Sequence, residues 1–125
     1  MTTNTLISVV DDDPSMSRML ARIISAAGFE VQSFGSAEAF LQSGRIDDSA
    51  CLILDVDLPG MNGLELQQKL NDSGYTLPII FISAEATEAM QKKMLDSGAI
   101  GFFKKPFSID SLLAKVRSVE SLTLI

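Results

Sequence analysis

The ten residues CLILDVDLPG (51–60) decide the fold of this chain. Four apolar residues lead directly into Asp55, and a second carboxylate, Asp57, follows two positions later. A continuous apolar run of this length is typical of a strand that is covered on both faces, as in a parallel sheet. Because a buried carboxylate is costly without a partner, the end of this strand raises the question of what its acids bind.

Similar apolar runs lie on both sides of this stretch. Residues 6–10 and 78–83 are also continuously apolar, whereas 29–34 and 100–103 favour shorter and more exposed strands. Segments with helix-start and helix-stop signals separate these strands; they comprise residues 14–27, 37–43, 64–73, 87–97 and 109–120. The strict alternation predicts an α/β fold with right-handed crossovers and a parallel sheet covered by helices on both faces.

Composition restricts the class of function. The 125 residues suit one domain, and the net charge of −6 argues against binding to nucleic acid or anionic lipid. The absence of histidine excludes histidine zinc sites and histidine general bases. Cys51 is the only cysteine, which excludes an internal disulfide, and we interpret it as a packing residue. No apolar run reaches a membrane span and no signal pattern opens the chain, which favours a cytoplasmic protein without a membrane partner.

Acids also follow the first predicted strand, where Asp11, Asp12 and Asp13 occur in succession. Ligands of an open α/β sheet bind beyond the carboxyl ends of its strands, so Asp11, Asp12 and Asp55 converge if the first and third strands are neighbours. Carboxylates this close repel one another unless a cation lies among them or some are protonated. An all-oxygen cluster suits Mg²⁺ or Mn²⁺. The alternative is a set of turn or cap residues, which we prefer for Asp13.

Two more polar residues are predicted at the same edge of the sheet. Ser83 ends the fourth strand, and Lys105 follows the fifth. A hydroxyl and an ammonium group beside a carboxylate–metal site provide the donors and the positive charge that a phosphoryl group needs. Taken singly, Ser83 is equally well explained as a helix cap and Lys105 as a solvated lysine.

Four blocks of the sequence, in order, make the chain resemble a response regulator receiver domain of two-component signalling. They are ISVVDDDPSMSRML, LILDVDLPGMNGLEL, PIIFISA and GAIGFFKKPF, and the resemblance covers essentially the whole chain. It implies a flavodoxin-like, doubly wound (βα)5 fold whose five-stranded parallel sheet has the order 2-1-3-4-5. It also implies one domain, residues 1–125, which either stands alone or is the N-terminal part of a longer regulator.

The resemblance assigns the metal positions residue by residue. Asp55 matches the phosphoacceptor aspartate of the family, which also binds the metal. Asp12 matches the direct metal ligand, and Asp11 matches its acidic neighbour, which usually acts through water. Asp57 matches the position that lends its backbone carbonyl to the Mg²⁺ or Mn²⁺ ion.

The remaining functional positions concern transfer and switching. Lys105 matches the lysine that contacts the phosphoryl oxygens, and Ser83 matches the switch hydroxyl. Phe102 falls where the family has its switch aromatic residue. Since side chains alternate along a strand, we expect one of Phe102 and Phe103 to face the core and the other to face outward, with Phe103 the simpler core residue.

The resemblance implies a signalling switch, not an enzyme beyond its own Mg²⁺-dependent phosphorylation and dephosphorylation. A sensor histidine kinase or a histidine phosphotransfer protein would donate the phosphoryl group to Asp55. The switch would then bias the face formed by the fourth helix, the fifth strand and the fifth helix, which addresses an output domain or a target protein. A homodimer on phosphorylation is a further expectation from the family, and direct binding of nucleic acid is not expected.

An alternative comes from ILDVDLPG, which also resembles the D-x-D motif of haloacid-dehalogenase-like phosphohydrolases. Asp55 would then be the nucleophile and Asp57 the general acid and base. That family places its motif near the start of the chain and has a larger core, and it gives no role to Asp11 and Asp12. For the side chains of Asp57 and Glu85, we consider both a role in tuning the lifetime of the phosphoryl group and the role of solvated surface acids.

Overall fold

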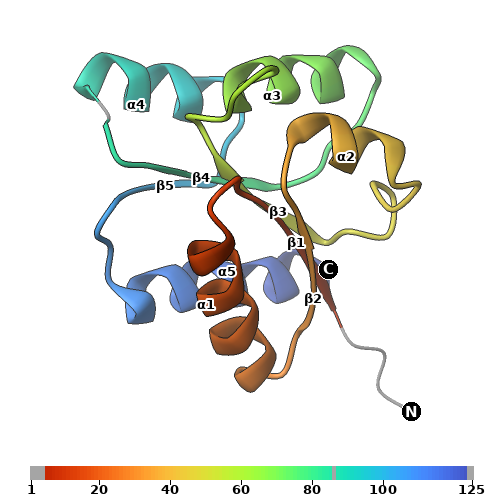
Figure 1. The fold of residues 1–125 in the computed structure, drawn as a ribbon, viewed down its shortest axis with the longest axis vertical. Helices are drawn as coiled ribbons and strands as arrows, with labels where there is room; N and C mark the ends of the chain where they lie inside the picture. Colours follow the sequence, from red (N-terminus) through yellow and green to blue (C-terminus); the bar gives the residue numbers. More distant parts are fainter. Residues whose placement is uncertain (1–4, 86, 124–125) are drawn as a thin grey trace.

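The computed structural model describes residues 5–85 and 87–123, in which strands and helices alternate along the chain (Figure 1). The strands are β1 (Leu6–Val10), β2 (Glu30–Phe34), β3 (Cys51–Asp55), β4 (Ile79–Ser83) and β5 (Gly101–Lys104). The helices are α1 (Pro14–Ala26), α2 (Ala37–Gln42), α3 (Gly63–Asp72), α4 (Glu88–Asp96) and α5 (Ile109–Thr123). Each predicted element is confirmed, with its ends shifted by a few residues. None of the helices in this part of the chain has the length and apolar character needed to span a bilayer.

The strands form one parallel sheet in the order β2-β1-β3-β4-β5, which confirms the predicted flavodoxin-like topology. Register decides which side chains meet at its carboxyl edge. Val10 of β1 pairs with Leu54 of β3, so the residues that follow, Asp11 and Asp55, lie at the same height on adjacent strands. The topology therefore brings acids 44 positions apart in sequence to one place.

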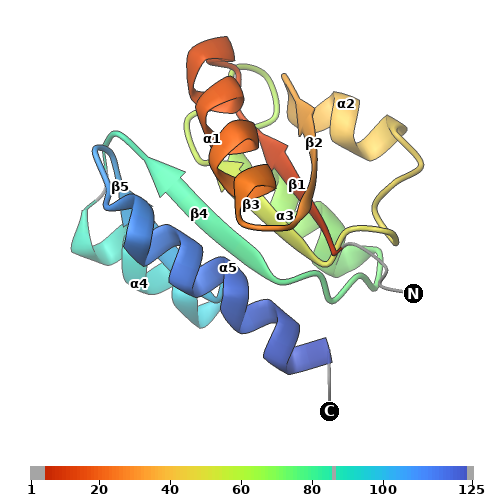
Figure 2. The same ribbon diagram turned by 90° about the horizontal axis from the view of Figure 1, so that it is seen from below.

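Helices cover both faces of the sheet (Figure 1), and Figure 2 shows the molecule from the side of α1 and α5. This coverage explains why the three central strands are continuously apolar. Helices α1 and α5 pack on one face, and α2, α3 and α4 pack on the other. The fully buried side chains include Leu20 and Ile24 of α1, Phe40 of α2, Leu66 of α3 and Phe81 of β4. Each contributes about 1.5–3 kcal/mol by leaving water, so the core needs no staple.

Cys51 belongs to the core on the α1 and α5 face. Burial raises the pKa of its thiol to about 12, so it is uncharged and unreactive at neutral pH. The interpretation of Cys51 as a packing residue is confirmed.

The edge strands β2 and β5 are only partly buried, as predicted. The expectation that one of Phe102 and Phe103 faces outward is wrong, because both are half-buried. They point to opposite faces of the sheet, and each face has its own core. Phe102 packs on the face of α2, α3 and α4, and Phe103 packs on the face of α1 and α5, with its ring centroid 6.2 Å from that of Phe107.

Side-chain caps begin the helices next to the carboxyl edge. Asp13 caps α1 by accepting the Ser15 N–H, which confirms its interpretation as a cap. Helix α3 begins with a capping box, in which Asn62 accepts the Glu65 N–H and the Glu65 carboxylate accepts the Asn62 N–H. These caps define where the chain turns from a strand into the following helix.

Gly63 lies directly against the backbone at the end of β3. Its N–H donates to the Val56 carbonyl oxygen at 3.1 Å. A Cβ on Gly63 would lie 2.7 Å from the Asp55 carbonyl oxygen and 2.9 Å from the Val56 Cα. Both of these atoms belong to the backbone, so only a shift of α3 or of β3 would relieve the contact. Glycine at position 63 therefore sets how closely α3 approaches Asp55.

Gly63→Ala is expected to lower the free energy of unfolding by about 1–3 kcal/mol, the usual cost of overpacking. Urea denaturation followed by circular dichroism measures this change. Gly35→Ala is the matched control, since a Cβ at Gly35 meets no atom within 4 Å. Its stability is expected to be unchanged or to rise by up to about 1 kcal/mol. Equal unfolding midpoints for Gly63→Ala and the wild type would contradict the close approach.

Candidate functional site

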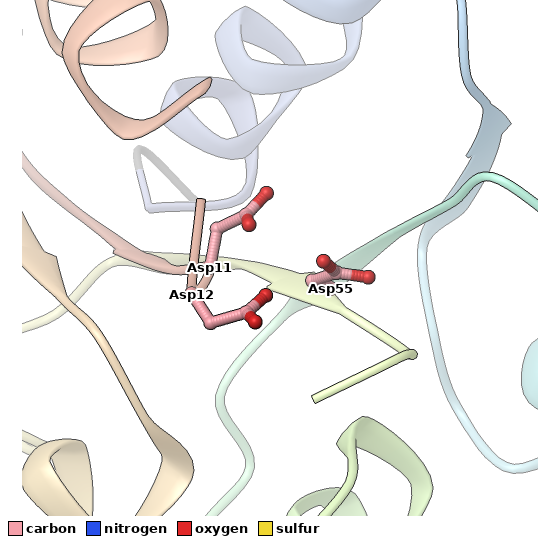
Figure 3. A group of neighbouring side chains, drawn as sticks. All are labelled: Asp11, Asp12 and Asp55. Carbon is pink, nitrogen blue, oxygen red and sulfur yellow. The ribbon is translucent and has the colours of Figure 1, made fainter. Parts of the chain in front are cut away.

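Three carboxylates meet at the carboxyl ends of β1 and β3. Figure 3 shows Asp11 and Asp12 at the end of β1 next to Asp55 at the end of β3. One ligand oxygen from each of the three lies within 4.8 Å of the others. Asp11 and Asp55 are only 2% and 4% exposed, whereas Asp12 is exposed. Two buried acids this close are costly unless the surrounding groups compensate their charge.

Backbone groups provide part of this compensation, in the same way for both buried acids. The Asp13 N–H donates to Asp11 Oδ1 at 2.9 Å, and the Asp57 N–H donates to Asp55 Oδ1 at 2.9 Å. Each acid thus accepts a bond from the residue two positions later, as the chain turns away from its strand. Such bonds favour the ionised carboxylate and hold its orientation.

Lys105 faces the second oxygen of both acids. Its Nζ lies 3.4 Å from Asp11 Oδ2 and 3.3 Å from Asp55 Oδ2. The backbone holds the residue in this position, because the Lys105 N–H donates to the Ser83 carbonyl oxygen at 2.7 Å. Burial lowers the pKa of Lys105, but the charges of Asp11 and Asp55 outweigh this effect and raise the pKa above 10.5. The ammonium group is therefore charged at neutral pH.

Asp11 keeps an unfavourable environment in spite of these contacts. Burial raises its pKa above 3.8, and the neighbouring charge of Asp55 raises it further. The bond from the Asp13 backbone and the charge of Lys105 lower this pKa, but they do not cancel the increase. Burial and the charge of Asp55 thus make the ionised form of Asp11 less favourable than it is in water.

The charges and donor atoms of this cluster fit a divalent cation. When ionised, the three carboxylates and the one ammonium group leave two net negative charges. All the candidate ligand atoms are carboxylate oxygens, which Mg²⁺ and Mn²⁺ prefer over softer ligands. Asp11, Asp12 and Asp55 therefore have the charge and the chemistry that a hard metal ion requires.

Ser83 lies at the same edge, as the sequence predicts, and its contacts are with the flanking loops. It is fully buried, and its Oγ lies 2.7 Å from Asp57 Oδ2 and 2.6 Å from the Glu85 carbonyl oxygen. The Glu85 N–H donates back to the same Oγ at 3.2 Å. The Asp57 side chain therefore binds Ser83, and its predicted contribution to a metal site through the backbone carbonyl stays a prediction.

Phe102 occupies the strand next to Ser83. Phe102 of β5 pairs with Phe81 of β4, so the two side chains point to the same face of the sheet. The ring of Phe102 therefore lies on the face covered by α4, where it belongs to the same apolar cluster as Met90 and Met94. The switch role of Phe102 stays a prediction.

Three contacts around the site are not predicted by the sequence. Glu38 Oε2, in the first turn of α2, accepts the Met61 N–H at 3.2 Å and so holds the loop that follows β3. The close approach of Gly63 and the bond between Ser83 and Asp57 are the other two. Among these features, the sequence contains a local pattern only for the start of α3, where Gly63 lies. This pattern is the N-x-x-E of a capping box at residues 62–65.

Comparisons with known proteins agree with this geometry. The family model of the response regulator receiver domain matches residues 7–117. Response regulator protein TmoT of Ectopseudomonas mendocina is 41% identical over 117 residues, which are 94% of this chain and 53% of that protein. Nodulation protein W of Bradyrhizobium diazoefficiens is 41% identical over 114 residues, which are 91% of this chain and 50% of that protein. The chain thus spans about half the length of these relatives.

Comparison with solved structures also identifies a response regulator as similar to this chain. Response regulator StyR superposes on this chain with a TM-score of 0.88 at 38% sequence identity. The superposition covers 96% of this chain and 61% of StyR. The similarity therefore includes both the fold and a substantial part of the sequence.

Asp11→Asn is expected to stabilise the metal-free protein at neutral pH. The pKa of Asp11 is higher in the folded protein than its ordinary 3.8, so the folded state holds this proton to a higher pH than the unfolded chain. The stability of the wild type therefore falls as the pH rises from about 4 through the folded-state pKa. Asparagine has no proton to lose and avoids this fall.

Urea denaturation with a chelator present, at pH 7 and near pH 4, measures the effect. The gain in the free energy of unfolding from Asp11→Asn is expected at pH 7 and is expected to shrink near pH 4. Asp47→Asn, which removes the charge of an exposed acid before β3, should change stability by less than about 0.5 kcal/mol at either pH. Loss of stability in Asp11→Asn at pH 7 would contradict this account of the buried acid.

Proposed function

The chain belongs to the response regulator receiver domain family, and from this we propose that it is a phosphoacceptor switch with Asp55 as its phosphorylation site. One observation supports this proposal above the others. The Asp55 carboxylate is buried beside two further acids, with the Asp57 N–H on one oxygen and the Lys105 ammonium on the other. This combination is suited to a carboxylate that accepts a phosphoryl group.

The transfer begins with attack by an Asp55 carboxylate oxygen on phosphorus. The donor is a phosphorylated histidine of a sensor histidine kinase or a histidine phosphotransfer protein, since this chain has no histidine of its own. A phosphorus–oxygen bond to Asp55 forms, and the phosphorus–nitrogen bond to the partner's imidazole breaks, which leaves the imidazole with the electron pair. The product is an acyl phosphate, which water later hydrolyses and so resets the switch.

Residues around Asp55 prepare it for this step. The Asp57 N–H holds the carboxylate plane in place, and Lys105 offers its ammonium group to the phosphoryl oxygens. Asp11, Asp12 and Asp55 would hold Mg²⁺ or Mn²⁺ together with the Asp57 backbone carbonyl. When bound, this ion supplies positive charge that offsets the repulsion between the carboxylates and the incoming phosphoryl group.

The switch follows from the charge that the phosphoryl group adds, about −1.5 to −2. Ser83 exchanges its present partners for a phosphoryl oxygen, and Phe102 moves inward into the space that Ser83 leaves. The face of α4, β5 and α5 shifts to a second arrangement, and phosphorylation changes the populations of the two arrangements. The contacts of Ser83 differ between the two arrangements, and this difference decides which arrangement is favoured.

We further propose a cellular context for the switch. Residues 1–125 act as one cytoplasmic receiver domain that addresses an output domain or a target protein, with homodimerisation through the α4, β5 and α5 face on phosphorylation. The alternative of a haloacid-dehalogenase-like phosphohydrolase has no support from the comparisons. Its general acid would be Asp57, whose carboxylate is engaged by Ser83.

Incubation with Mg²⁺ and a small acyl phosphate donor is expected to add one phosphoryl group to the wild-type chain, detected by intact mass and mapped by peptide analysis. Asp55→Asn should show no such addition, because the amide is a poor nucleophile. Asp47→Asn, which changes the same charge near the other end of β3, should be labelled as the wild type is. Undiminished labelling of Asp55→Asn would reject the assignment, and turnover of a phosphatase substrate would favour the hydrolase.

A further inference from the structure

The Ser83 hydroxyl has no free donor capacity in this structure. A serine has one O–H donor, and here two acceptors lie within hydrogen-bond distance of it, Asp57 Oδ2 at 2.7 Å and the Glu85 carbonyl oxygen at 2.6 Å. The Glu85 N–H also donates to the Ser83 oxygen. Because Ser83 is fully buried, solvent does not provide a ready alternative partner.

Asp57 is in contact with both the proposed phosphoacceptor, Asp55, and the proposed switch residue, Ser83. Its backbone N–H donates to Asp55 Oδ1 at 2.9 Å, and its side chain accepts from Ser83 Oγ. Asp57 lies in the loop after β3 and Glu85 in the loop after β4, so the Ser83 hydroxyl ties together the two loops that flank Asp55. Asp57 therefore connects the carboxylate of Asp55 to the hydroxyl of Ser83.

A phosphoryl group on Asp55 would compete with Asp57 for the same proton. Both are anionic acceptors, and Ser83 cannot donate fully to both. Any switched state in which Ser83 binds the phosphoryl group requires the bond between Ser83 and Asp57 to break.

We propose that Asp57 is a positioning residue that holds Ser83 in its unphosphorylated arrangement and thereby opposes the switch. The inference rests on the proposed function, because it concerns how the phosphoacceptor site controls Ser83. It assigns to the Asp57 side chain a role separate from the predicted metal contact of its backbone. Ser83 must also leave the Glu85 carbonyl oxygen in order to switch, and the contact with Asp57 adds to the cost of that change.

The experiment measures the affinity of the full chain for beryllofluoride in the presence of Mg²⁺, by isothermal titration calorimetry. Beryllofluoride is a non-covalent analogue of a phosphoryl group on a carboxylate. Asp57→Ala is expected to bind it about tenfold more tightly than the wild type, which is near the lower end of the contribution of a hydrogen bond to a charged group. Asp57→Asn, which keeps an oxygen acceptor, should lie between the two.

A double-mutant cycle with Ser83→Ala separates the hydrogen bond from the charge of Asp57. If Asp57 acts through Ser83, Asp57→Ala in the Ser83→Ala background should change the affinity by less than about twofold. A tenfold gain that persists in this background would show a simple charge effect and would overturn the proposal. Asp47→Ala removes an equal charge elsewhere and should leave the affinity unchanged.

A second readout needs no phosphoryl analogue. In the free protein, Asp57→Ala should speed hydrogen exchange of the Glu85 amide, because its acceptor, Ser83 Oγ, is no longer held. Unchanged exchange would overturn the positioning role even where beryllofluoride binds well. Failure of the wild type to bind beryllofluoride at all would instead reject the proposed function, and this inference with it.

Discussion

The Lys105 ammonium group lies between two buried carboxylates, and the organisation of the site depends on this contact. Register places Asp11 and Asp55 at the same height on adjacent strands, so their charges oppose each other inside the protein. Two unit charges about 4 Å apart interact by about 4 kcal/mol at an effective dielectric constant of 20, which is a large part of the stability of a small domain. One lysine offsets such a repulsion but leaves the charge of the cluster unbalanced. A cluster of this kind is prepared to receive a cation and then a phosphoryl group.

The fold provides this arrangement by confining polarity to one edge of an otherwise apolar sheet. The central strands are buried on both faces, and their ladders continue past their last residues. The Val56 N–H donates to the Ile82 carbonyl oxygen, and the Lys105 N–H donates to the Ser83 carbonyl oxygen. Functional side chains are therefore attached to hydrogen-bonded backbone rather than to free loops. Rigidity of this kind suits a site in which the exchange of a single hydrogen bond, that of Ser83, changes the state of the molecule.

The sheet and the convergence of the acids were predictable because they depend on local patterns. Continuous apolar runs indicate covered strands, and an acid after each of two such runs places Asp11, Asp12 and Asp55 at one edge. The contact between Ser83 and Asp57 was not predictable, because it depends on the rotamers of two side chains 26 positions apart. The prediction that one of Phe102 and Phe103 faces outward was wrong for a different reason. Alternation along a strand indicates opposite faces, but it does not tell whether the second face is also covered.

The most direct test of this account is a titration of the ¹⁵N-labelled protein with Mn²⁺, followed by the loss of amide signals through paramagnetic relaxation. Because this relaxation falls steeply with distance, it locates the ion without any assumption about activity. The amide signals of Asp12, Asp13 and Asp57 are expected to weaken first and together. Early loss of the signals of Asp47 and Asp48, with those three unaffected, would contradict it.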